Sequence, residues 1–114
     1  MKSIYLDNAA TTKMDAQVLE VMHTSMQDTY GNPSSTHQFG RRAKSAVETA
    51  RKNIAKQLNV SAAEIIFTAG GTEADNLILH NAVLNLGVTT IITSKIEHHA
   101  VLHTCNYLEK TYNI

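Results

Sequence analysis

The sequence has one cysteine, one proline and no tryptophan among its 114 residues. With Cys105 alone, no disulfide can form within the chain, which favours a reducing, cytoplasmic setting. There is no signal-peptide pattern at the start, and no stretch approaches the roughly 18 apolar residues that a membrane span needs. Ten basic residues balance ten acidic ones, so no charge excess favours nucleic acid or an anionic membrane as partner.

A hydrophobic content of 43% is typical of one globular domain with a modest core. Asp15 is expected to cap a helix that ends near Tyr30, because Gly-Asn-Pro follows at 31–33. A second helix is predicted over 39–58, and Ser61 and Glu64 are expected to form a capping turn after it. The apolar stripe predicted for the second helix consists of Ala43, Ala46, Val47, Ala50, Ile54 and Leu58.

The second half alternates between predicted strands and helices. Residues 65–67 and 89–93 are β-prone and indicate two short strands. Between them a largely apolar helix is expected to begin near Thr72, to be mostly buried and to end at Gly87. A last helix carries Val101, Cys105 and Leu108 on one face. This order predicts an α/β fold with a sheet between helices, and the sheet is expected to be unfinished at Ile114.

Residues 67–76, FTAGGTEADN, form a glycine turn before a helix. Gly70 and Gly71 let a ligand approach the backbone, and bare amides at a helix start favour an anion, so a phosphate cradle is one interpretation. An ordinary strand–helix turn capped by Thr72 and Asp75 is the other, and this segment alone favours it. The P-loop and dinucleotide patterns are both missing here.

Residues 94–101, SKIEHHAV, follow the second predicted strand. His98 is therefore expected near the same sheet edge as the glycine turn, where an imidazole could stack on a flat cofactor and exchange protons. Two alternatives remain open. His98 could simply cap a helix, or His99 and His103, four residues apart, could bind a metal, although too few further ligands are at hand for zinc.

The loop at 31–40, GNPSSTHQFG, has hydroxyl residues suited to capping a helix, and His37 could instead face a ligand. Cys105 lies on an apolar stripe, which favours a buried structural thiol over a nucleophile.

Four segments, taken together and in this order, resemble the cysteine desulfurases of the NifS/IscS type in the class V aminotransferase family. They are YLDNAATT at 5–12, GNPSSTHQFG at 31–40, FTAGGTEADN at 67–76 and TSKIEHHAV at 93–101. The resemblance implies a homodimeric fold type I enzyme that uses pyridoxal 5′-phosphate (PLP). It implies conversion of L-cysteine to L-alanine, with the sulfur passed as a persulfide to iron–sulfur scaffold or tRNA-thiolation proteins.

Matched motif by motif, the resemblance implies that Gly71 and Thr72 bind the cofactor phosphate. It implies that His98 stacks on the pyridine ring and serves in proton transfer. Residues expected near the substrate are Asn8, Ala9, Ala10, Thr11, Asn32 and His37.

The resemblance reaches only the first part of the family's sequence. The family's cofactor-binding lysine, pyridine-pairing acid and persulfide cysteine are expected beyond Ile114, and Lys95 and Cys105 match none of them. Residues 1–15 would then be a segment near the active site, and 16–114 an incomplete part of the large cofactor-binding domain. Such a fragment is expected to be inactive alone, and marginally stable or self-associating because of unpaired strand edges.

Two other classes of protein remain open. One is a different fold type I PLP enzyme, such as a selenocysteine lyase or an aminotransferase relative. The other is a non-enzymatic module that binds phosphate or self-associates.

Overall fold

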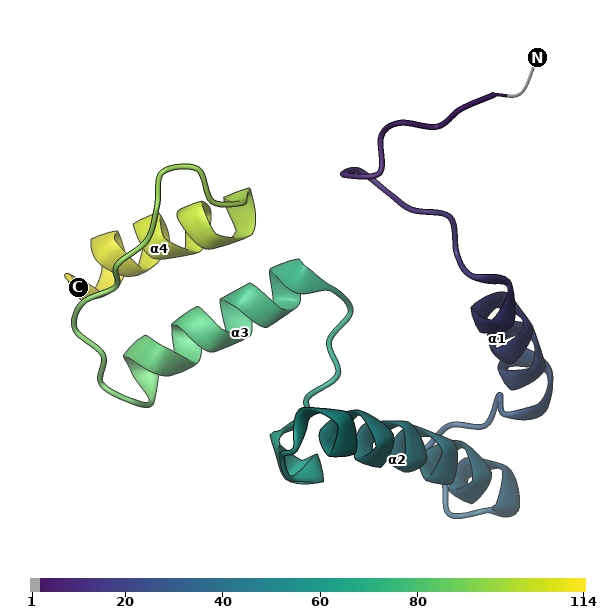
Figure 1. The fold of residues 1–114 in the computed structure, drawn as a ribbon. Coiled ribbons are helices and arrows are strands. Elements are labelled where there is room, and N and C mark those ends of the chain that lie inside the picture. Colours follow the sequence, from purple (N-terminus) through teal and green to yellow (C-terminus); the bar gives the residue numbers. More distant parts are fainter. Residues whose placement is uncertain (1–2) are drawn as a thin grey trace. The chain divides into compact units, whose positions relative to one another are not determined.

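The computed structural model describes residues 3–114, which form two compact units, one up to Ile65 and the other from Ile66 to Ile114. The first unit contains helix α1 (Ala16–Asp28), helix α2 (Gln38–Leu58) and a single 3₁₀ turn, η1 (Ala62–Glu64). The second contains α3 (Gly71–Leu84) and α4 (His99–Tyr112), as Figure 1 shows. Within residues 3–114, no helix is both long and apolar enough to cross a membrane.

Helix α1 begins where the sequence predicts. The Asp15 carboxylate accepts a hydrogen bond from the Gln17 amide at 2.8 Å, and the helix ends at Asp28, two residues before Tyr30. Across the described residues, α1 contributes no buried side chain, and Val18 and Met22 are 48% and 44% exposed. Its apolar positions at spacings of four are therefore not covered by any other part of residues 3–114.

The loop before α2 packs tightly on the helix start. The Tyr30 and Phe39 rings stack with centroids 5.7 Å apart. A Cβ added to Gly40 would lie 2.6 Å from the Asn32 carbonyl oxygen and 2.7 Å from the Ser35 Cβ, closer than real Cβ contacts come. Glycine is needed there because the loop backbone touches the helix directly, which explains one glycine of the 31–40 motif.

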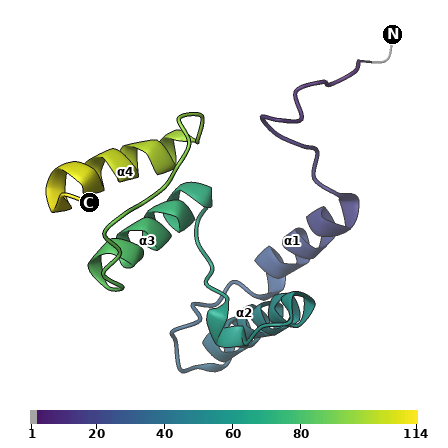
Figure 2. The ribbon, with the colours of Figure 1, turned by 60° about the vertical axis from the view of Figure 1, so that its left-hand side comes forward.

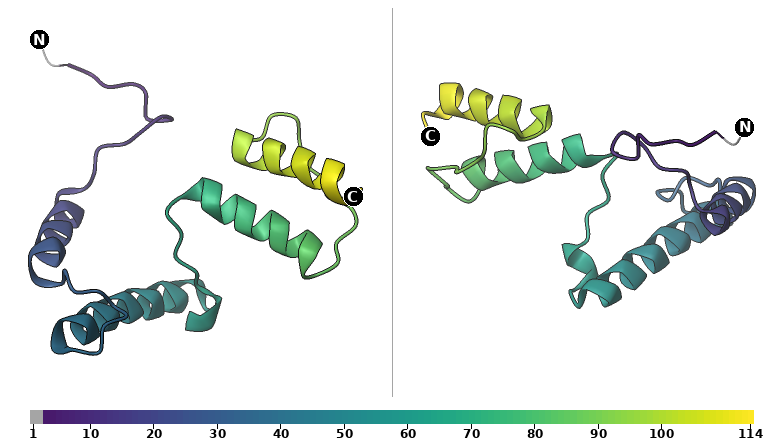
Figure 3. Two further views of the ribbon diagram at one scale, coloured as in Figure 1. Left: turned by 180° about the vertical axis from the view of Figure 1, so that it is seen from behind. Right: turned by 45° about the horizontal axis from the view of Figure 1, so that its top comes forward.

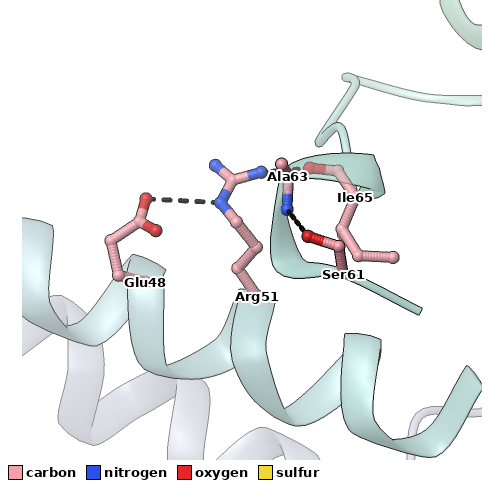
Figure 4. Close-up of polar contacts among 5 residues, drawn as sticks. All are labelled: Glu48, Arg51, Ser61, Ala63 and Ile65. Atoms are coloured by element: carbon pink, nitrogen blue, oxygen red, sulfur yellow. Dashed lines mark hydrogen bonds and ion pairs between the residues drawn. The ribbon is translucent and has the colours of Figure 1, made fainter. Parts of the chain in front are cut away.

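The end of η1 is held on α2 by a contact from Arg51 (Figure 4). The Arg51 guanidinium donates to the Ile65 carbonyl oxygen and, through Nε at 3.3 Å, to the Glu48 carboxylate. The predicted capping turn is confirmed: Ser61 Oγ accepts from the Ala63 amide, and the Glu64 carboxylate accepts from the Ser61 amide at 2.7 Å.

Helices α3 and α4 lie side by side in all the views (Figures 1, 2 and 3). Thr104 Oγ1 in α4 lies 2.8 Å from Asn76 Oδ1 in α3, and one turn further along both helices the His80 and Tyr107 rings have centroids 5.7 Å apart. Both pairs advance in the same direction along the chain, so the two helices run parallel. Their interface buries Ala100, Thr104 and Leu108, which recur every four residues on α4.

The two predicted strands are not formed within residues 3–114, where 65–67 and 89–93 are irregular. A β-strand needs a hydrogen-bonded neighbour, and these segments have none in the described part of the chain. The α/β class therefore stays a prediction, as does the assignment of residues 1–15 and 16–114 to an active-site segment and a large domain. Gly87 was predicted to cap the end of α3, but the helix ends at Leu84 with Asn85 as its C-cap; Gly87, three residues beyond Leu84, has a left-handed conformation with φ of 69°.

The predicted burial of the helices was wrong in two places. No α3 side chain is buried within residues 3–114, where a mostly buried helix was expected. Of the stripe predicted on α2, Ala43 is buried, whereas Val47, Ile54 and Leu58 are exposed. The periodicity marks which face is apolar, but burial also requires a second surface, and these faces are not covered by the described residues.

Candidate functional site at the start of α3 and α4

Helix α3 starts differently from the other helices of the described chain. Asp15, His37 and His98 each cap their helix with a side chain, whereas the residue before α3, Gly70, provides no side-chain cap within residues 3–114. The first bond into this helix is made by the Ala74 amide to the Gly70 carbonyl oxygen at 3.2 Å. The amides of residues 71–73 therefore face outward at the positive end of the helix dipole.

The space in front of these amides is open. A shallow hollow there is lined by Ala69, Gly70, Gly71, Thr72, Glu73 and Asn76. Among the described residues, a Cβ added at Gly70 or Gly71 would meet nothing within 4 Å. Gly70 has an extended φ of 170°, which other residues also adopt. Neither the backbone conformation nor the packing therefore requires glycine at these two positions. The absence of side chains leaves the amides accessible to a ligand.

The glycine turn is shaped by its own side chains. The Glu73 carboxylate accepts a hydrogen bond from the Ala69 amide at 2.6 Å, and Thr68 Oγ1 donates to the Gly70 carbonyl oxygen at 3.2 Å. Glu73 is the one acidic side chain in the first turn of α3. The hydrogen bond to the Ala69 amide therefore fixes the Glu73 carboxylate against the backbone that precedes the helix.

His98 caps α4, which is the structural alternative that its sequence position left open. Its Nδ1 accepts a hydrogen bond from the Ala100 amide at 3.1 Å. The preceding loop is closed by Ser94, whose hydroxyl donates to the Glu97 carboxylate at 2.8 Å. The imidazole remains exposed, and the cap uses Nδ1 and not Nε2. Capping and contact with a ligand are therefore compatible for this ring.

The starts of α3 and α4 lie at the same end of the second unit, as all three ribbon figures show. Asn76 is five residues after Gly71, and Thr104 is six residues after His98. At 1.5 Å per residue, the paired side chains lie about 7.5 Å and about 9 Å along their helices from these positions. Gly71 and His98 are thus at nearly the same level of two parallel, adjacent helices.

The bridge between Asn76 and Thr104 was missed by sequence reasoning. The spacing of four residues between Thr72 and Asn76 could have indicated the contact within α3, in which the Asn76 Nδ2 donates to the Thr72 carbonyl oxygen at 2.8 Å. The partner across the helix pair, 28 residues away in sequence, follows no local pattern.

The residues predicted near the substrate belong to the first unit. Asn8, Ala9 and Ala10 form an exposed turn in which the Ala10 and Thr11 amides donate to the Asp7 carbonyl oxygen at 3.1 and 3.3 Å. Within the 31–40 loop, Asn32 Oδ1 accepts from the Ser34 amide at 2.9 Å, and His37 Nδ1 accepts from the Gly40 amide at 3.4 Å. These contacts account for local structure, and a substrate role for these residues stays a prediction.

Two other candidate sites from the sequence are the His99–His103 pair, as metal ligands, and the Cys105 thiol. The His99 and His103 rings are adjacent, with centroids 5.1 Å apart, but residues 3–114 hold no group of at least three His, Cys, Asp or Glu residues suited to a metal. Cys105 is half-buried on α4 and lines a hollow with Thr90, Glu109 and Ile114 among others.

Comparisons with known proteins bear out the resemblance to the cysteine desulfurases. The aminotransferase class-V family model matches residues 4–114. A Bacillus subtilis (strain 168) protein named "Putative cysteine desulfurase IscS 1" is 54% identical over 112 residues, covering 96% of this chain and 29% of that protein. Cysteine desulfurase IscS of Dictyoglomus turgidum is 47% identical over 111 residues, and that of Methanosarcina thermophila 47% over 110, covering 28% and 27% of those proteins.

A solved structure described as a NifS-like protein is similar to this chain with a TM-score of 0.82 and 44% identity. The match covers 94% of this chain and 30% of that one. The chain therefore spans less than a third of the length of the relatives that it matches. The family match, the sequence identities and the structural similarity agree, and this chain belongs to the aminotransferase class-V family.

Proposed function

We propose that this chain supplies the phosphate-binding and ring-binding part of a PLP-dependent cysteine desulfurase. The observation that carries the proposal is that the uncapped start of α3 lies at the same end of the second unit as the start of α4, where the exposed His98 stands. The names of its relatives add the reaction: several proteins that are 47–54% identical are called cysteine desulfurases.

The residues present fit such a cofactor. A phosphate needs donors, and the outward amides of residues 71–73 with the Thr72 hydroxyl supply them at the positive end of a helix dipole. A pyridine ring needs a flat partner, which the exposed His98 imidazole can be. When bound, PLP supplies the electron sink for bond breaking at the substrate α-carbon, and the protein holds and orients it.

The cap also defines the proton arrangement of His98. Because Nδ1 accepts a hydrogen bond from the Ala100 amide, it carries no proton in the capped state. The proton of the neutral ring is then on Nε2, which is the atom able to donate to a substrate or cofactor group. His98 would thus act in proton transfer through Nε2 while Nδ1 keeps the helix start in place.

The rest of the proposal concerns the whole enzyme. L-cysteine is the substrate and L-alanine the product, with Asn8, Ala9, Ala10, Thr11, Asn32 and His37 close to the substrate. The enzyme is a cytoplasmic homodimer that passes sulfur to an iron–sulfur scaffold or a tRNA-thiolation protein. The cofactor-binding lysine and the persulfide cysteine are supplied by sequence other than these 114 residues.

A chimera tests the proposal. Residues 1–114 replace the matching segment of the Bacillus subtilis relative, which is 54% identical over 112 residues. The chimera should retain PLP and release L-alanine from L-cysteine. Thr72→Ala should weaken PLP retention by about ten-fold or more, since a hydrogen bond to a charged group is lost, whereas Thr72→Ser should restore it. A folded chimera that retains no PLP, or a Thr72→Ala variant with unchanged retention, contradicts the phosphate site.

A further inference from the structure

We propose that Asn76 and Thr104 are positioning residues, whose bridge keeps the first turns of α3 and α4 in register so that one PLP molecule contacts both. The inference rests on the proposed function and extends it to the contact between the two helices, in which Asn76 also lines the hollow in front of the α3 amides. It starts from a series of close polar contacts between the two helix starts, in which the single Thr104 hydroxyl proton is shared between two acceptor oxygens.

The series has three contacts. In α3, the Asn76 Nδ2 donates to the Thr72 carbonyl oxygen at 2.8 Å. Between the helices, Thr104 Oγ1 donates to Asn76 Oδ1 at 2.8 Å, and within α4 the same hydroxyl lies 2.7 Å from the Ala100 carbonyl oxygen. Since the Thr72 carbonyl can only accept, the Asn76 amide nitrogen faces it and the amide oxygen faces Thr104. Thr72 and Ala100 are the residues through which each first turn is held.

The bond between the helices is not required to satisfy the buried hydroxyl. Thr104 is 5% exposed, and its hydroxyl already has an acceptor within its own helix in Ala100. A valine would fill the same space at the interface. What the Asn76 contact adds is direction: it specifies which turn of α3 faces which turn of α4, a choice that small apolar contacts leave less defined.

This arrangement predicts that breaking the bridge lowers the affinity for two ligands by different amounts. Inorganic phosphate needs only the start of α3, whereas a phosphorylated pyridine must reach both the α3 amides and His98. Breaking the bridge should therefore lower the affinity for the phosphorylated pyridine more than the affinity for phosphate. A general loss of stability would lower both affinities to the same extent.

The experiment uses the 114-residue chain and two probes, inorganic phosphate and pyridoxine 5′-phosphate, which has no aldehyde to react with lysines. Binding is followed by NMR through the Gly71 and Thr72 amides. Thr104→Val should weaken pyridoxine 5′-phosphate by about three-fold to ten-fold and change phosphate binding less than about two-fold. Thr104→Ser, which keeps the hydroxyl, should bind like the unmodified chain.

Asn76→Ala is the second variant, because alanine favours the helix and the Thr104 hydroxyl then donates to the Ala100 carbonyl oxygen. Combining it with Thr104→Val should add little further loss, as expected for two residues of one contact. The matched control is Asn81→Ala, which removes the exposed Asn81–Asn85 amide contact further along α3 and should change neither ligand. Helix content by circular dichroism shows that each variant is folded.

The outcomes separate the two proposals. An unmodified chain that binds neither probe refutes the phosphate site, and with it this inference. A second outcome is that the unmodified chain binds both probes and that Thr104→Val and Asn76→Ala each bind pyridoxine 5′-phosphate with the same affinity as the unmodified chain. That outcome refutes the positioning role of the bridge but not the phosphate site. Equal loss of both probes assigns Asn76 and Thr104 to general stability and also overturns the positioning role.

Discussion

The two tasks assigned to His98, capping α4 and contacting a ring, can be separated by substitution. His98→Ala removes the acceptor that the Ala100 amide uses at 3.1 Å, whereas His98→Asn keeps a good helix cap and removes the imidazole. Loss of a cap costs about 1 kcal/mol, which corresponds to about a five-fold change in the local opening equilibrium. Loss of a stacked ring costs about 0.5–1.5 kcal/mol, or roughly two-fold to ten-fold in affinity.

Amide hydrogen exchange and ligand titration give the two readouts. The Ala100 amide should exchange about five-fold faster in His98→Ala and nearly normally in His98→Asn. Both variants should bind pyridoxine 5′-phosphate about two-fold to ten-fold more weakly than the unmodified chain. If His98→Asn exchanges as fast as His98→Ala, the capping argument is refuted. If His98→Asn binds the ligand normally, the ring contact is refuted.

Two further predictions concern the stability of the first unit, measured by urea unfolding. Gly40→Ala should destabilise it by about 1–3 kcal/mol, because the added Cβ overlaps the Asn32 carbonyl. Gly70→Ala, in the second unit and with open space beside it among the described residues, is the control and should be nearly neutral; equal losses would contradict the packing argument. Arg51→Ala should cost about 1–2 kcal/mol through its bond to the Ile65 carbonyl, whereas Glu48→Gln, at the half-exposed ion pair, should cost under about 1 kcal/mol; a reversed order would count against this account.

Local features of this chain are determined by the sequence itself. The Asp15 cap, the Ser61–Glu64 capping box and the left-handed Gly87 all depend on residues within a few positions of one another. Hydrogen bonds of this range form whenever the right side chain stands next to bare helix amides. The four motifs likewise identified the family without any coordinates, because each combines residues close together in sequence.

Features that need a second surface could not be read in this way. Periodicity predicted buried stripes on α2 and α3, but α3 has no buried side chain among the described residues. The segments at 65–67 and 89–93 have β-prone composition, yet strand formation depends on neighbours that are absent from residues 3–114. Burial and strand pairing are properties of two elements together, so one segment's residues cannot decide them.

The candidate site likewise has one part that the sequence predicts and one part that depends on the packing of two helices. The sequence alone pointed to Gly71, Thr72 and His98, because a glycine turn before a helix and a histidine before the next one are local patterns. Only the tertiary structure decided that these two helix starts lie at one end of a parallel pair, joined by Asn76 and Thr104 across 28 residues of chain. Packing between α3 and α4 brings that pair together, and no local rule links residues so far apart.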